Sequence, residues 1–233
     1  MTDVVFSWKA RYTITIGTSD KRDHDITVDD PNETEILSSP FYKGDKENTR
    51  RYLAKRKAEA NISRFCNHLA VETGSPTSYS LNSLDFLENG ERKFSQREVS
   101  IGVSAQIGAP ISEADFLSLE NEVSVRSDSL LDSYADLYNR YLKSKDVFEK
   151  YKLLYLIASK EANKDLALRT IRNMLHHPKL DCSRHPDQCR KAEELFGPGM
   201  ISIQLSNPDH QRKIQEHLPK LRQIAKSIID GLK

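Results

Sequence analysis

The 233-residue chain contains few cysteines, few glycines and no long apolar run, and each shortage excludes a class of protein. The three cysteines, Cys66, Cys182 and Cys189, are too few for a secreted disulfide scaffold and fit a reducing compartment. The longest apolar stretches, such as residues 153–158, are far too short to cross a bilayer. The first residues lack the charged and apolar segments of a signal peptide. We therefore expect a cytoplasmic protein without membrane association.

A strong charge of one sign is also missing, because the net charge is only +1. No global field draws the molecule onto nucleic acid, so any basic binding surface must be local, and we expect no DNA partner. The nine glycines are scattered and form no phosphate-binding loop. A Ser/His/Asp arrangement and a metalloprotease helix motif are absent as well. We therefore expect no cofactor.

The first half of the chain mixes strand and helix patterns. Residues 4–17 alternate large apolar and polar side chains, which predicts a strand, and residues 20–32 are rich in turn formers around one short strand. Residues 47–72 contain no Gly or Pro and predict one long amphipathic helix. Strands are expected at 77–88 and 93–107, divided by an Asn89-Gly90 turn. The strand spacing of four aromatic residues predicts core positions for Trp8, Tyr12, Tyr79 and Phe94.

The second half has the 3.6-residue period of helices almost throughout. We expect short loops between these helices, and hence an antiparallel bundle. The predicted helices are 113–143 (with a break near Ser124), 146–161, 164–177, 187–195 and 208–231. The sequence thus predicts an α+β protein with a mixed domain at 1–110 and a helical domain at 111–233.

The hexapeptide Arg172-Asn173-Met174-Leu175-His176-His177 is the strongest functional signal in the chain. It closes the predicted helix 164–177, directly before Pro178, and helix ends are common places for functional polar groups. Arg172 and His176 lie four residues apart, so one side of the helix carries both.

This stretch, LALRTIRNMLHHPKL, within a run of helices resembles the HEPN superfamily (higher eukaryotes and prokaryotes nucleotide-binding domain) over roughly residues 120–231. Ribonucleases of that family carry an Arg, a polar neighbour and a His a few residues further on. Arg172, Asn173 and His177 match this arrangement, with four residues between Arg and His. His176 is the adjacent alternative. The resemblance implies a helical bundle that forms a homodimer, with two motifs in one composite active site.

The residue types of the motif suit the cleavage of RNA without a metal. Histidine titrates near neutrality, so it can take the proton of a 2′-OH or protonate the leaving 5′-oxygen. The planar guanidinium of arginine can hold the phosphate oxygens on which charge accumulates. The resemblance therefore implies an endoribonuclease of stress, toxin or phage-defence biology, with Arg172 and His177 in catalysis and Asn173 positioning them. The alternative is a non-catalytic module that dimerises or binds a nucleotide.

Three further patterns are weaker. Residues 43–64 hold eight basic and three acidic residues. The basic residues at the centre of this segment are candidate contacts to RNA: Arg50, Arg51, Lys55, Arg56 and Lys57. The alternative is a solvated face of the predicted helix 47–72. Cys182, His185 and Cys189 do not have the spacing of a familiar zinc site, so we expect no metal, and a reducing cytoplasm disfavours a Cys182–Cys189 disulfide. Glu149 and Glu161 flank a predicted helix and are candidate partners of Arg172, with a plain surface position as the alternative.

Overall fold

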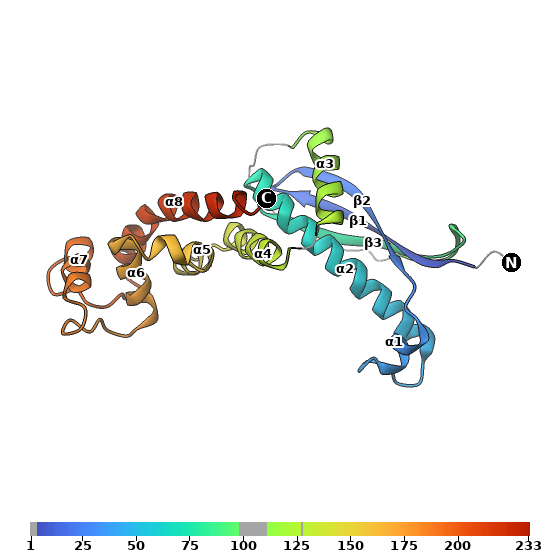
Figure 1. Ribbon diagram of the computed structural model, residues 1–233, viewed down its shortest axis with the longest axis horizontal. Helices are drawn as coiled ribbons and strands as arrows, with labels where there is room; N and C mark the ends of the chain where they lie inside the picture. Colours follow the sequence, from blue (N-terminus) through green and yellow to red (C-terminus); the bar gives the residue numbers. More distant parts are fainter. Residues whose placement is uncertain (1–3, 98–110, 127) are drawn as a thin grey trace. The chain divides into compact units, whose positions relative to one another are not determined.

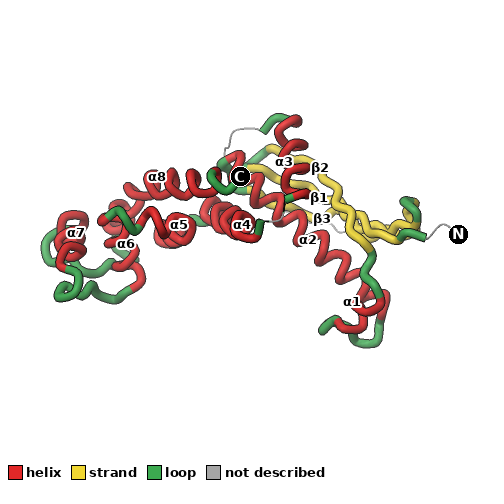
Figure 2. Tube along the Cα trace, viewed as in Figure 1, coloured by secondary structure: helices red, strands yellow, loops and turns green. Residues whose placement is uncertain are grey.

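In a computed structural model of the chain, residues 4–97, 111–126 and 128–233 are described. The chain divides into two compact units, Met1–Ser127 and Asp128–Lys233. The described part of the first unit holds a four-stranded antiparallel sheet and three helices, and that of the second holds five helices (Figures 1 and 2). The α+β fold class predicted from the sequence is therefore confirmed.

The sheet has the strand order β2-β1-β3-β4. Its strands are β1 (Phe6–Ile16), β2 (Asp20–Asp29), β3 (Thr77–Glu88) and β4 (Glu91–Arg97). The alternation in β1 buries Trp8, Tyr12 and Ile14 on one face, as the period-two pattern predicts. The strand β2 is longer than the short strand expected there. Its sequence signal is weak, because charged residues alternate with the buried His24 and Val28.

The turn between β3 and β4 is the predicted one. Asn89 and Gly90 both have positive φ angles, 49° and 82°, which is the backbone that an Asn-Gly hairpin turn requires. The strand predicted at 93–107 is described only to Arg97, and residues 98–107 lie outside the described part of the chain. Tyr79 and Phe94 are not core residues as predicted, since 38% and 45% of their surfaces are exposed.

One face of the sheet packs against the helix α2 (Lys46–Thr73), which lies across β1, β2 and β3 (Figure 1). Its buried face carries Ala54, Ala58, Ile62, Phe65 and Leu69. The helix ends at Gly74, whose φ of 63° suits the left-handed cap. The short helix α1 (Glu33–Ser38) begins with a capping box between Asn32 and Glu35; it has too few residues for a periodic signal and was not predicted.

The helix α3 (Glu113–Val125) belongs to the sheet unit, whereas the sequence placed everything after residue 110 with the bundle. Its buried Phe116, Leu119 and Val123 join the same core cluster as the sheet and α2. Helical periodicity shows that a segment is a helix but not which core receives its apolar face. The predicted break near Ser124 is present, and the unit ends just after it.

The second unit consists of α4 (Ser129–Lys143), α5 (Val147–Ala162), α6 (Leu166–His176), α7 (Pro186–Phe196) and α8 (Pro208–Asp230). The long α8 contacts the other four helices of the unit. Asp128, Asp146, Asp165 and Asn207 cap the first turns of α4, α5, α6 and α8 with their side chains. Among the described residues, no helix combines the length and the apolar character needed to cross a membrane.

Candidate functional site

The helix α6 sets the position of the motif. Its N-cap is Asp165, whose carboxylate accepts a hydrogen bond from the backbone N–H of Leu168 at 3.0 Å. Leu168, Ile171 and Met174 are buried and fix the rotation of the helix about its axis. Arg172 and His176, one turn apart, therefore lie together on a more exposed side.

That side of α6 and the neighbouring α5 form a pocket of about 360 Å³. From α6 the pocket is lined by Arg172, Leu175 and His176. The remaining lining residues, from α5 and the turn after it, are Tyr151, Lys152, Tyr155, Leu156, Ser159 and Asn163. The lining thus contains two permanent cations and an imidazole but no carboxylate, which is the charge pattern of an anion site.

Burial and the positive charges of Arg172 and Lys152, with His177, lower the pKa of His176 from its ordinary value of 6.5. The imidazole is therefore mainly neutral at pH 7 and can accept a proton. Burial raises the pKa of Tyr155, and its hydroxyl donates to Asn163 Oδ1 at 2.6 Å. The pocket therefore combines a neutral proton acceptor with two cations.

A chain of hydrogen bonds holds the guanidinium of Arg172. Its Nη1 donates to Oδ1 of Asn173 at 2.8 Å, and Nδ2 of Asn173 donates to Oε1 of Gln188 at 2.7 Å. Gln188 belongs to α7 and only 5% of its surface is exposed. Asn173 thus holds the guanidinium of Arg172, and Gln188 in turn holds the amide of Asn173. Gln188 was not predicted, because no pattern in the sequence shows that α7 packs on this side of α6.

His177, the first choice from the sequence, does not line the pocket. It is the exposed C-terminal cap of α6, and its backbone N–H donates to the carbonyl of Asn173 at 2.9 Å. The structure therefore brings Arg172 together with His176 and leaves His177 beside the pocket at the helix end. The candidate carboxylates have other partners, since Glu149 accepts from Ser144 at 2.7 Å and Glu161 pairs with Lys164 at 2.6 Å.

The expectation that Cys182 and Cys189 stay unpaired is wrong. The first turn of α7 folds back on the loop that follows α6, which brings the two Cα atoms to 5.6 Å, and the cysteines form a disulfide. The disulfide uses the sulfur atoms of both Cys182 and Cys189, so neither thiol is left to bind zinc together with His185. Among the residues that the structure describes, no group of three His, Cys, Asp or Glu side chains is arranged to hold a metal ion. Cys189 is the direct neighbour of Gln188, so the disulfide holds the turn that carries Gln188.

The basic residues of α2 are largely compensated by acidic neighbours. Arg50 pairs with Asp30 and Lys57 with Glu35, while Arg51 lies 3.8 Å from Glu47. Arg50 and Arg51 also stack over Phe86 and Phe94, each with 5.0 Å between the guanidinium carbon and the ring centroid. Of the five candidates, Lys55 is half-buried and Arg56 is the exposed one. The solvated, internally paired face is the interpretation that these contacts favour.

Comparison of the chain with protein-family models, with curated proteins and with solved structures finds no match in any of the three. The pocket between α5 and α6, with Arg172 and His176 in its lining, is the candidate functional site of the described residues.

Proposed function

We propose that the protein is an endoribonuclease of the HEPN type that cleaves RNA by attack of the 2′-OH on the adjacent phosphorus. The observation that carries the proposal is the pocket between α5 and α6. There Arg172 and Lys152 supply positive charge, His176 supplies a largely neutral imidazole, and no carboxylate opposes an anion. Such a pocket is suited to a phosphodiester, because every charge in it favours the phosphate.

In this mechanism the imidazole of His176 takes the proton of the 2′-OH. The 2′-oxygen forms a bond to phosphorus, and the bond from phosphorus to the 5′-oxygen breaks. Arg172 holds the non-bridging oxygens while negative charge accumulates on them, and the Asn173–Gln188 pair keeps the guanidinium in place. His177, exposed at the end of α6, protonates the leaving 5′-oxygen. The products are a 2′,3′-cyclic phosphate and a 5′-hydroxyl.

A homodimer completes the proposal. Leu156 lies at the pocket with 58% of its surface exposed, although it is a large apolar residue. A second copy that covers Leu156 would exclude water from the pocket and bring a second motif next to the first.

The experiment compares cleavage of a fluorescent RNA in EDTA by the wild type and by Arg172→Ala, His176→Ala and His177→Ala. We expect each variant to lose roughly a hundredfold or more in rate, because charge stabilisation and proton transfer each contribute about that much. Arg169→Ala, a change in the same helix outside the pocket lining, is the control and should stay active. Equal rates in all five proteins would exclude the motif from catalysis.

The second candidate is a module that binds a nucleotide without cleaving it. The same cationic lining favours it, since a phosphate can be held there without any reaction. In that case Arg172→Ala weakens the binding of a nucleotide, measured by calorimetry. RNA incubated with the wild type or with either histidine variant is recovered uncleaved.

A further inference from the structure

The disulfide between Cys182 and Cys189 lies next to the hydrogen bonds that hold Arg172. Cys189 directly follows Gln188, whose Oε1 accepts a hydrogen bond from Asn173 at 2.7 Å. Asn173 in turn accepts a hydrogen bond from Arg172 at 2.8 Å. A covalent bond therefore ends one residue away from Gln188, and Arg172, at the other end of this series of contacts, lines the pocket between α5 and α6.

The first turn of α7 lacks the kind of cap that begins the other four helices of its unit. Residues 128–233 are all described, and in α4, α5, α6 and α8 an Asp or Asn side chain accepts a hydrogen bond from a backbone N–H of the first turn. The N-cap of α7 is His185, whose side chain makes no such bond, and a missing cap destabilises the first turn of a helix. Gln188 and Cys189 are the third and fourth residues of α7. The disulfide therefore holds a turn that has no side-chain cap.

The loop before α7 is itself attached to α6. Leu180 is buried in one cluster with Met174 of α6. Asp181 then closes a turn, because its backbone carbonyl accepts a hydrogen bond from the backbone N–H of His185 at 2.9 Å. Cys182 lies within this turn. The disulfide therefore ties the first turn of α7 to a loop whose position α6 determines.

The two cysteines differ in their access to solvent. Cys182 is exposed, whereas Cys189 is buried with 8% of its surface exposed. A thiolate from solution can therefore attack the sulfur of Cys182, so that the sulfur of Cys189 is the leaving group. Cys189 lies near the N-terminal end of α7, where the helix dipole stabilises the negative charge of a departing thiolate. Both features favour opening of the disulfide from the Cys182 side.

We propose that the Cys182–Cys189 disulfide is a redox switch that controls the arginine of the motif, and this proposal rests on the proposed ribonuclease function. The reductant is a dithiol. One of its thiolates bonds to the sulfur of Cys182 while the bond to Cys189 breaks, and its second thiolate then displaces Cys182 and closes a disulfide within the reductant. Two electrons and two protons pass to the protein, which is left with two thiols. Without the bond the first turn of α7 unwinds, Gln188 leaves Asn173, and the guanidinium of Arg172 loses its fixed position.

Cleavage rates measure the switch in the full-length protein. RNA is cleaved in EDTA by the oxidised protein and by protein treated with dithiothreitol, and alkylation of the unfolded samples counts one free thiol before reduction and three after it. We expect reduction to lower the rate about tenfold, the loss also expected of Gln188→Ala. In Gln188→Ala itself, reduction should lower the rate no further, because both changes remove the same contact to Asn173. The double variant with serine at positions 182 and 189 should match the reduced wild type with or without dithiothreitol.

NMR spectra test the switch without RNA. The side-chain amide of Asn173 donates to Gln188, so its signals should move towards those of a free amide after reduction. The side-chain amide of Asn163 is the control within the same unit, because its Oδ1 accepts a hydrogen bond from Tyr155 of α5 at 2.6 Å and not from α7. Its signals should keep their positions.

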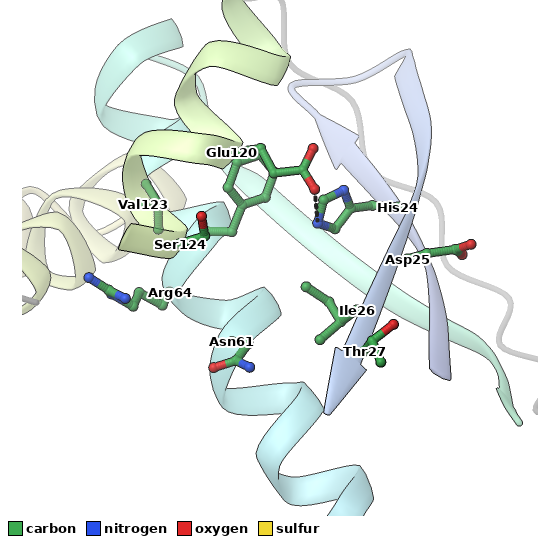
Figure 3. Close-up of a pocket in the computed structure, with 10 residues that line it drawn as sticks. His24, Asp25, Ile26, Thr27, Asn61, Arg64, Glu120, Val123 and Ser124 are labelled. Carbon is green, nitrogen blue, oxygen red and sulfur yellow. Dashed lines mark ion pairs between the residues drawn. The ribbon is translucent and has the colours of Figure 1, made fainter. Parts of the chain in front are cut away.

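The sheet unit supplies a second control, for general damage by the reductant. Its pocket of about 280 Å³ is lined by residues of β2, α2 and α3, all of them before Ser127 (Figure 3). There His24 faces Glu120, with 3.8 Å between Nε2 and the carboxylate, and stacks on Phe65 with 4.9 Å between the ring centroids. Because these neighbours belong to the sheet unit, the ring signals of His24 should keep their positions on reduction.

The two readouts separate the switch from the ribonuclease. A protein that cleaves no RNA in either state, but whose Asn173 signals alone move on reduction, supports the switch and excludes the proposed function. Asn173 signals that stay in place after all three thiols are counted would overturn the switch, even when RNA is cleaved. A disulfide that resists dithiothreitol in the folded protein, a fall in rate on reduction that is as large in Gln188→Ala as in the wild type, or His24 signals that move together with those of Asn173 would also overturn it.

Discussion

Gln188→Ala should loosen the guanidinium of Arg172 although Gln188 does not line the pocket. The substitution removes the acceptor that holds Nδ2 of Asn173 at 2.7 Å, and Asn173 in turn holds Arg172 at 2.8 Å. Gln188 is buried, so the amide of Asn173 gains little compensation from water. One such lost hydrogen bond costs about 1–2 kcal/mol. Gln188→Glu is the matched variant, because its carboxylate still offers an acceptor at the same place.

Urea unfolding followed by circular dichroism measures the free energy of unfolding, and the fluorescence of Trp8, the only tryptophan, reports on the sheet separately. We expect Gln188→Ala to lower the free energy of unfolding seen by circular dichroism by about 1–2 kcal/mol, and Gln188→Glu to restore most of it. In the RNA assay, Gln188→Ala should lower the rate roughly tenfold, as about 1.4 kcal/mol of transition-state stabilisation is lost. A Gln188→Ala variant with wild-type stability and wild-type rate would refute the role of the hydrogen bonds that link Gln188, Asn173 and Arg172.

The remaining predictions concern the disulfide and the buried histidine of the sheet. The Cys182–Cys189 bond joins residues seven apart, so the double variant with serine at both positions should lose about 2.5 kcal/mol of unfolding free energy, and a reducing agent should have the same effect on the wild type and none on the variant. A wild type that is insensitive to reduction would contradict this. Because the pKa of His24 is lowered by burial, the unfolded chain binds a proton below pH 6.5 that the folded chain does not. The free energy of unfolding should therefore fall as the pH drops from 6.5, by up to about 1.4 kcal/mol per pH unit for this group, and His24→Gln should remove that part of the slope; an unchanged slope would refute the assignment.

Most elements of the fold could be predicted, because their signals are local. The alternation in β1, the Asn89-Gly90 turn and the uninterrupted apolar stripe of α2 each reflect the nearest neighbours in the chain. The membership of α3 could not be predicted in this way. Its three buried residues show only that one face of the helix is apolar, and the tertiary packing places that face with the sheet.

The candidate site was predictable only in part. The motif on α6 was found from the sequence, and the spacing of Arg172 and His176 places them on one side of the helix. Gln188 and the disulfide follow from the fold of the loop between α6 and α7, which the periodicity of either helix does not determine. The full length of β2 was missed because its alternating charges resemble a turn-rich segment.

The most direct test of the proposed function is single-turnover cleavage in EDTA of a short RNA and of the same oligonucleotide with one 2′-deoxy residue at the cleaved position. The mechanism predicts a 2′,3′-cyclic phosphate from the RNA, no cleavage at the deoxy position, and loss of the product in Arg172→Ala and His176→Ala. Cleavage of the deoxy substrate at the wild-type rate, or a cyclic phosphate formed equally well by Arg172→Ala, would contradict it.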